Sequence, residues 1–272
     1  MFDCVIALGA SHIAGFGISN YVNTGLKYMQ GEITLEEMDE SNKHLAYPAL
    51  VANHFNIPCY NYAMSGSSND RTLRLLPQLL LNHPNSLVLI AWAPVDRNEF
   101  YIPNEGKFIG RDKDKYLQVG VQFSVEDDDW SRKGHPDELR PEFEAMDKRI
   151  NKFFVENLMY IDSSNTKICN QLFYADQACK NFAKDFRHIY DSQIFENNTI
   201  PEKYKNSLDF KKVLNFSLDK KYDLEKNTGW TKNLYHGTYE DFCNSYFEEV
   251  YHGHYGEDAH RAVADLIISS LS

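Results

Sequence analysis

The segment Val5-Ile-Ala-Leu-Gly9-Ala-Ser11 decides the prediction of the fold, because an unbroken apolar run leads straight into a glycine and a serine. Continuous apolar strands are typical of parallel sheets that helices cover on both faces. We therefore expect a buried strand over residues 4–8, with Ser11 just beyond its carboxyl end.

Strands and helices alternate outward from this segment. The patterns predict a helix at 45–55, a strand at 58–63, a helix at 71–81 and a strand at 86–92. This alternation indicates a parallel sheet with crossover helices. Loops rich in small residues follow the strands, at the edge where open α/β sheets bind their ligands.

The remainder of the chain fits one domain. Residues 101–140 are polar and lack a clear period, so we expect an elaborated insertion or lid there. The patterns then predict two long helices, a fourth strand and a final amphipathic helix, at 142–158, 166–184, 186–191 and 259–271. We predict a single domain over 1–272, an α/β fold of the flavodoxin-like type with a central parallel sheet in a three-layer sandwich.

Charge and composition limit the partners. The chain of 272 residues carries 28 Lys and Arg against 39 Asp and Glu, a formal net charge of −11. Binding to phosphate backbones or anionic lipid needs clustered basic side chains, and no apolar run approaches the roughly 20 residues that span a bilayer. We therefore expect a small-molecule substrate, and no nucleic-acid or membrane partner.

The cysteines and the first residues bear on location. The five cysteines are an odd number and form no CxxC pair, so the spacing of zinc ligands is absent. Met1 leads directly into FDCVIALGAS, without the basic segment and longer apolar run of a signal peptide. Free thiols fit a reducing compartment, and we expect a cytoplasmic protein.

Ser11 is a candidate nucleophile. Serine alone is a poor nucleophile and needs a neighbouring base, while backbone N–H groups at a strand end can stabilise an oxyanion. The alternative is that Ser11 caps a helix, a position that serine favours.

Two other segments supply groups that a serine nucleophile needs. In residues 61–70, NYAMSGSSND, Gly66 can bring a backbone N–H close to a ligand, and Asn69 can donate a side-chain N–H or cap the next helix. His252-Gly-His254 lies just before the final helix, and histidine is the usual general base near neutral pH. A His-x-His pair can also chelate a metal, but no further ligand stands at a set spacing, so we predict no metal site.

The order of these segments resembles the SGNH, or GDSL, hydrolases. Gly9-Ala-Ser11 looks like the GDS block of that family with alanine in place of aspartate, and Gly66 matches the glycine of the second block. Residues 63–69 are similar to bacterial and phage members, and the histidine before a terminal amphipathic helix looks like that of the DxxH block. The resemblance implies a serine ester hydrolase that needs no cofactor. In it the catalytic pair would be Ser11 and His254, and the oxyanion hole would use the N–H groups of Ser11 and Gly66 with Asn69 as a third donor.

Two blocks depart from the family pattern. The third block should read GxND after its strand, but Val95 stands where the asparagine is expected. The aspartate of DxxH is also replaced, since Tyr251 stands three residues before His254, while a second register would use His252 with Glu249. These departures leave the fold prediction intact and weaken the prediction of activity.

Two residues near the presumed active edge are candidate substrate-binding groups. Arg97 follows the third strand and can bind an anionic group of the substrate, or pair with Asp96 or Glu99. His12 adjoins the nucleophile, although it would point the other way if the chain is still extended there.

Three functions are open on sequence alone. The first is a serine esterase acting on a small acyl ester, with an O-acetyl group on a sugar as the substrate class that the family suggests. The second is a catalytically weakened binding or structural protein of the same fold, which the changes at Val95 and Tyr251 favour. The third is a nucleotide-binding protein that holds phosphate at residues 66–68 and makes no Ser–His contact.

Overall fold

A four-stranded parallel sheet lies at the centre of the computed structural model, which describes residues 1–16, 18, 27, 32–33, 35–93, 97–101, 116–120, 161–190, 210–214, 216, 239–251 and 254–271. The strands are β1 (Val5–Leu8), β2 (Cys59–Asn61), β3 (Leu87–Trp92) and β6 (Asp185–Tyr190). They pair in the order β2-β1-β3-β6, all parallel. This order matches the first four strands of the flavodoxin-like arrangement, so the predicted fold class is confirmed.

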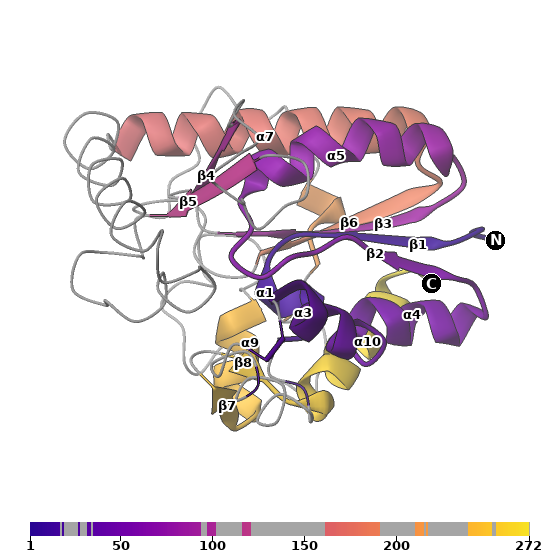
Figure 1. Ribbon diagram of the computed structural model, residues 1–272. Coiled ribbons are helices and arrows are strands. Elements are labelled where there is room, and N and C mark those ends of the chain that lie inside the picture. The colour runs from indigo at the N-terminus through magenta and orange to yellow at the C-terminus, as the bar shows by residue number, and fades with distance from the viewer. Residues whose placement is uncertain are drawn as a thin grey trace, which may run out of the picture.

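Helices cover both faces of the sheet (Figure 1). On one face lie α5 (Asn69–Asn82) and α7 (Ile161–Phe182), and on the other lie α4 (Tyr47–Phe55) and α10 (Glu257–Ser270). Successive side chains of a strand point to opposite faces, so a strand covered by helices on both faces buries both sets of side chains. This is why every residue of β1 and β3 is buried.

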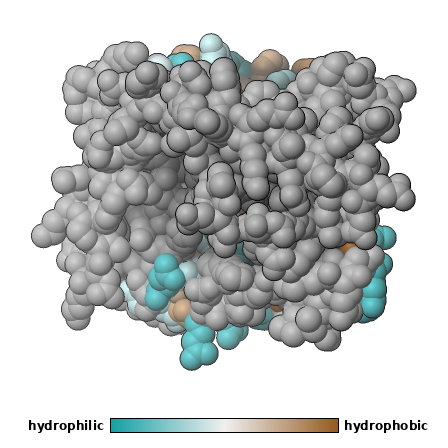
Figure 2. Space-filling view, turned by 60° about the vertical axis from the view of Figure 1, so that its left-hand side comes forward, coloured by the Kyte–Doolittle hydropathy of each residue, from teal (hydrophilic) through white to brown (hydrophobic). Residues whose placement is uncertain are grey.

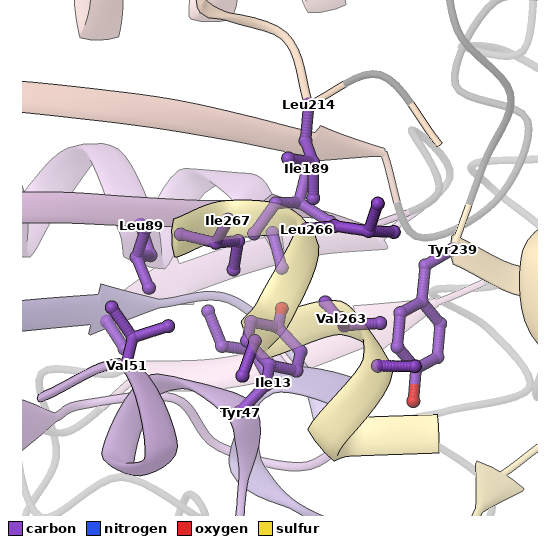
Figure 3. Packing of buried hydrophobic residues seen from close by; sticks show 14 of the residues in the cluster. Ile13, Tyr47, Val51, Leu89, Ile189, Leu214, Tyr239, Val263, Leu266 and Ile267 are labelled. Carbon is purple, nitrogen blue, oxygen red and sulfur yellow. The ribbon is translucent and has the colours of Figure 1, made fainter. Parts of the chain in front are cut away.

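The core is divided between the two faces. On the α4 and α10 side, Val51, Leu89, Val263 and Ile267 belong to one buried cluster (Figure 3). On the other side, the alternate residues of β1 and β3 pack with α5 and α7 in a second cluster. The predicted helix at 142–158 lies outside the described residues.

A pair of antiparallel strands follows the third strand of the sheet. β4 (Arg97–Tyr101) pairs with β5 (Tyr116–Gly120), which falls inside the predicted insertion, where the pattern indicated no strand. The carboxylate of Glu99 in β4 accepts from Nε and Nη2 of Arg74 in α5, each at 2.9 Å, so this strand is bound to the helix layer. Residues 121–140 of the predicted insertion lie outside the described part of the chain.

The remaining described elements are short helices and strands outside the central sheet. They are α1 (Ser11–Ala14), α3 (Leu35–Lys43), the 3₁₀ turn η2 (Phe210–Lys212), α9 (Tyr239–Tyr246), β7 (Glu249–Tyr251) and β8 (His254–Tyr255). β7 and β8 form a small antiparallel sheet directly before α10. The elements nearest the predicted site are therefore α1 at the start of the chain and β8 close to its end.

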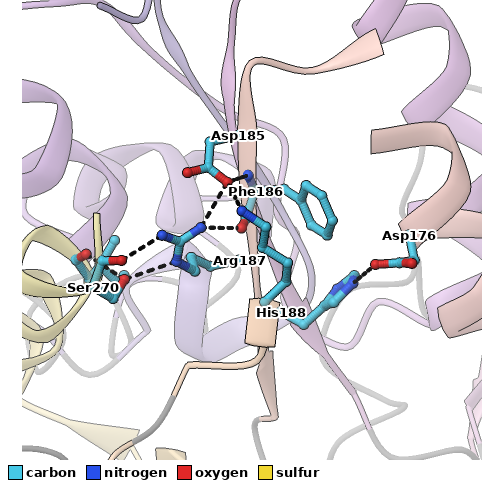
Figure 4. A network of polar contacts seen from close by, with 8 residues as sticks. Asp176, Asp185, Phe186, Arg187, His188 and Ser270 are labelled. Atoms are coloured by element: carbon cyan, nitrogen blue, oxygen red, sulfur yellow. Dashed lines mark hydrogen bonds and ion pairs between the residues drawn. The ribbon is translucent and has the colours of Figure 1, made fainter. Parts of the chain in front are cut away.

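Two polar networks fix β6 between the helical layers (Figure 4). Arg187 donates to the carbonyl of Ser270 at 2.6 Å and to the carboxylate of Asp185 at 2.8 Å, which ties the strand to the end of α10. On the other face, Nδ1 of His188 accepts from the indole of Trp92 at 3.0 Å, and its Nε2 lies 3.8 Å from Asp176 of α7.

The described surface and the cysteines are ordinary for a globular protein. Side chains along the lower edge of the face in Figure 2 are mostly hydrophilic, with isolated hydrophobic ones among them. None of the helices within the described ranges has the length and apolar character to cross a membrane. All five cysteines are free, while the cytoplasmic location predicted from them stays a prediction.

Candidate active site

Ser11 is the first residue of α1, directly beyond β1 at the carboxyl edge of the sheet. The residue in the N-cap position is Ala10, and no side chain caps the helix there, so the alternative that Ser11 is a helix cap is wrong. The N–H groups in the first turn of a helix lack intrahelical acceptors. Ser11 therefore belongs to the turn that carries these free N–H groups, and the residue is 8% exposed.

Gly9 makes the turn from β1 into α1 possible. Its φ is 143°, a conformation that side chains rarely adopt. A Cβ at this position would lie 2.5 Å from the carbonyl oxygen of Ala91 and 2.9 Å from Ile13. Only glycine lets the chain pass this close to β3 and still deliver Ser11 to the strand end.

His254 contacts Ser11 across almost the whole length of the sequence. The distance between His254 Nε2 and Ser11 Oγ is 2.8 Å, which is a hydrogen bond. For Nε2 to accept from the hydroxyl, the neutral ring must carry its proton on Nδ1. The structure thus brings the predicted pair together in the geometry that a nucleophile and its general base require.

The β7–β8 hairpin presents His254 to the site. Tyr251 is paired with His254 across this hairpin. The residue three positions before the histidine therefore stands opposite it, and in the DxxH pattern that residue would be aspartate. His252, the histidine of the second register, lies outside the described residues.

Two rings of the N-terminal segment contact the imidazole of His254. The ring centroid of His12 lies 4.7 Å from it at an interplanar angle of 33°, and that of Phe16 lies 4.5 Å from it at 53°. The expectation that His12 points the other way assumed an extended chain, and it is wrong because residues 11–14 are helical. Its predicted contact with substrate stays a prediction.

Residues 63–69, the second block, are hydrogen-bonded to the first block, Gly9-Ala-Ser11. Met64 donates its N–H to the carbonyl of Gly9 at 3.1 Å, and Ser67 donates to the carbonyl of Met64 at 3.0 Å. The second bond closes a four-residue turn whose third position is Gly66, with a φ of 76°, as a type II turn requires. The structure thus places Gly66 in a turn attached to the segment that ends in Ser11, while its role as an oxyanion donor stays a prediction.

Asn69 connects the second block to the end of β3. Its Nδ2 donates to the carbonyl of Ala93 and its Oδ1 accepts from the N–H of Ala93, both at 2.9 Å. The cap of α5 is Ser68 rather than Asn69. An amide nitrogen carries two N–H groups, so an oxyanion bond from Asn69 would use the one that Ala93 does not. Val95, at the expected asparagine of the third block, lies outside the described residues.

Asn61 joins two segments of the site, a role that the sequence analysis missed. Its Nδ2 donates to the carbonyl of Ile13 in α1 at 2.8 Å, and its Oδ1 accepts from the N–H of Ala63 at 3.1 Å. This side chain therefore ties the nucleophile helix to the second block. The sequence signal for this role is an asparagine at the end of a strand and before a turn, where its side chain can bind backbone groups.

Arg97 begins β4 and is partly buried. Glu99, one of its two predicted partners, binds Arg74 through both carboxylate oxygens, and the other, Asp96, lies outside the described residues. A contact between Arg97 and substrate stays a prediction. Within the described ranges, no group of three or more His, Cys, Asp or Glu side chains is arranged to hold a metal ion.

His260 lies close to the site in sequence but differs from His254 in its surroundings. It is completely buried, its ring stacks on Tyr47, and its Nδ1 accepts the Tyr47 N–H at 3.2 Å. Burial, and secondarily the nearby His12, lower the pKa of His260 to about 3. His260 is therefore neutral at physiological pH and holds the start of α4 against α10.

Comparison with known proteins gives only distant similarities. No model of a protein family matches the chain, and no curated protein matches it. Among solved structures it is similar to the psychrotrophic esterase EstA from a Pseudoalteromonas species, at 13% identity and a TM-score of 0.41, over 99% of this chain and 96% of that one.

Two further solved structures give comparable values. A phospholipase A1 from Streptomyces albidoflavus NA297 has 15% identity and a TM-score of 0.33, over 100% of this chain and 75% of that one. A carbohydrate esterase, described as having divergent catalytic and non-catalytic binding functions, has 13% identity and a TM-score of 0.39, over 98% and 67%. At these values the similarities assign no activity to this chain.

Proposed function

We propose that this protein hydrolyses esters, with Ser11 as the nucleophile and His254 as its general base. The observation that carries the proposal is the 2.8 Å contact between Ser11 Oγ and His254 Nε2 at the carboxyl edge of a parallel sheet. Serine needs such a base to attack a carbonyl. The order of the sequence blocks that resemble the SGNH hydrolases supports the same reaction.

In the first half of the proposed reaction, Ser11 Oγ forms a bond to the ester carbonyl carbon as its proton passes to His254 Nε2. The carbonyl electrons move to the oxygen, which becomes an oxyanion. When the tetrahedral intermediate collapses, the bond to the alcohol oxygen breaks, and the protonated imidazole returns the proton to this leaving group. The product that stays behind is an acyl ester of Ser11.

In the second half, water takes the place of the alcohol. His254 removes a proton from the water molecule, whose oxygen attacks the acyl carbon. When the second intermediate collapses, the bond from the acyl carbon to Ser11 Oγ breaks, the protonated imidazole returns its proton to Oγ, and the acid is released. The N–H groups of Ser11 and Gly66, with Asn69 as a third donor, would hold the oxyanion in both steps. One such donor is worth about 3–4 kcal/mol of barrier in other serine hydrolases.

The substrate class proposed is a small acyl ester, such as an O-acetyl group on a carbohydrate. The family resemblance suggests the acetylated sugar. Arg97 is the candidate for contact with the rest of the substrate.

The alternative is a binding protein of the same fold, which the tyrosine at position 251 and the valine at position 95 favour. That function does not require His254 to reach Ser11, and the contact between them weighs against it. The nucleotide-binding alternative required that no Ser–His contact be present, so we do not propose it.

Hydrolysis of a panel of acetyl, butyryl and long-chain p-nitrophenyl esters and of an acetylated sugar tests the proposal. The wild-type protein should cleave the acetyl esters fastest, and Ser11→Ala should reduce the rate to the uncatalysed background. Ser86→Ala is the matched control, because Ser86 is also buried but precedes β3 at the opposite edge of the sheet. A rate that is unchanged in Ser11→Ala, or folded wild-type protein that cleaves none of the esters, would contradict the proposal.

A further inference from the structure

The general base is held by the same short helix that carries the nucleophile. His254 contacts the hydroxyl of Ser11 and the rings of His12 and Phe16, and all three residues lie in or directly after α1. Any movement of α1 relative to the sheet would therefore carry the nucleophile and these two ring contacts together. The orientation of the imidazole is coupled to the position of the serine.

α1 itself is anchored on several sides. Asn61 binds the carbonyl of Ile13 at 2.8 Å, and Phe16 donates its N–H to the carbonyl of Ser11 at 3.0 Å. Phe16 is buried, and the contacts at Gly9 leave no space for a Cβ between α1 and β3. The surface that α1 offers to His254 is thus preorganised, as a site with a fixed base requires.

The ring of His12 also contacts a residue of the core. Its ring lies 4.8 Å from that of Tyr239 at an angle of 40°. Tyr239 is completely buried in α9, where its ring contacts those of Tyr255 and His260. The His12 ring is therefore placed between a fixed tyrosine and the imidazole of His254, and it can transmit the rigidity of the core to the base.

We infer that His12 is a positioning residue, whose ring holds the imidazole of His254 against Ser11. The inference rests on the proposed function and adds a chain-specific device to it. In the DxxH pattern an aspartate three residues earlier would orient the histidine, and this chain has Tyr251 there. Ring contact can supply orientation, because the planar imidazole packs against aromatic neighbours in defined geometries.

Positioning and substrate binding by His12 make opposite demands on its chemistry. If the ring positions His254, an aromatic side chain without nitrogen can replace it. If a ring nitrogen binds substrate, a polar side chain without a ring can replace it in part. The pair His12→Phe and His12→Gln therefore separates the two roles in one experiment.

We expect His12→Phe to keep most of the wild-type kcat on an acetyl ester. His12→Gln should lower kcat by roughly 10- to 100-fold with little change in KM, since misplacing a catalytic group by about an ångström costs up to that factor. Thermal melting of both variants controls for folding. Loss of activity in His12→Phe, whether or not His12→Gln retains it, would overturn the inference, as would full activity in His12→Gln.

Nuclear magnetic resonance of the histidine side chains tests the same contact without using catalysis. The ring protons of His254, assigned with His254→Gln, should show a ring-current shift in the wild type and in His12→Phe, and that shift should decrease in His12→Gln. Equal shifts in all three proteins would overturn the inference. If the wild type cleaves no ester while the shift behaves as expected, the proposed function fails and the positioning contact stands.

Discussion

His254 and His188 are two histidines of this protein with contrasting surroundings. His188 lies in the middle of β6, where it faces the carboxylate of Asp176 (Figure 4) and accepts a hydrogen bond from the indole of Trp92. His254 lies at the carboxyl edge of the sheet, against the hydroxyl of Ser11. The chain thus pairs a carboxylate with the histidine inside the core, and a serine with the histidine at the edge where α/β sheets bind ligands.

The comparison teaches that a carboxylate beside a histidine does not mark an active site by itself. Burial alone would raise the pKa of Asp176, but the nearby imidazole of His188 and the ammonium of Lys180, which lies 2.6 Å from the carboxylate, outweigh burial and lower it. Because Nδ1 of His188 accepts from Trp92, the proton of the neutral ring is on Nε2, toward Asp176. In the core, His188 serves as the acceptor for the buried indole N–H of Trp92, whereas the base at Ser11 needs access to a substrate.

The largest effect is expected from the histidine at the edge. His254→Ala should lower kcat/KM for an acetyl ester by about 10³-fold, within the range that a general base contributes, and leave the free energy of unfolding nearly unchanged. His54→Ala, at an exposed position of α4, is the matched control. Initial rates measure the loss of kcat/KM, and urea unfolding measures the stability. A fully active His254→Ala would contradict the role of His254 as general base.

The opposite result is expected from the histidine in the core. His188→Leu leaves the Trp92 indole N–H without its acceptor and takes one partner from a buried carboxylate, so the free energy of unfolding should fall by about 2–3 kcal/mol. The kcat of the folded protein should stay within about twofold, since His188 lies away from the reacting atoms. A large loss of kcat at unchanged stability would show that the core network belongs to the site.

The smallest effect concerns His260 and the pH dependence of stability. The pKa of His260 is about 3 in the folded protein against 6.5 as its ordinary value, so the unfolded chain binds the extra proton between these two pH values. The stabilisation is complete above pH 6.5 and decreases as the pH falls, by up to about 1.4 kcal/mol per pH unit.

His260→Gln keeps an acceptor for the Tyr47 N–H and removes the titration. Urea unfolding of both proteins between about pH 7.5 and about pH 5 should therefore show a shallower loss of stability in His260→Gln. Parallel curves for the two proteins would mean that His260 titrates normally in the fold.

The sequence was sufficient to predict the strands of the sheet and the two residues, Ser11 and His254, that meet at the site. β1 and β3 are continuous apolar runs, a pattern that is typical of strands buried on both faces. The start of α7 was predicted five residues late, because residues 161–165 are mostly polar and their helix depends on continuation from the apolar turns that follow. β5 was missed because Tyr116–Gly120 lies in a polar segment without a strand period.

The contacts around Ser11 and His254 show where sequence reasoning stops. A helix of four residues such as α1 leaves no periodic signal, so the direction of the His12 ring could not be predicted. The bonds from Asn69 to Ala93 and from Asn61 to Ile13 join segments that only the folded sheet brings together. The order of the family blocks predicted which residues meet, and packing decided how they are held.

Labelling with a fluorophosphonate probe tests the central claim most directly, because the probe forms a covalent bond only with an activated serine. The modified residue would be read by mass spectrometry in the wild type and in Ser11→Ala and His254→Ala. The proposed function predicts a single modified serine, Ser11, in the wild type and no labelling in either variant. Folded wild-type protein that stays unlabelled, or is labelled equally in His254→Ala, would contradict the proposal that His254 activates Ser11.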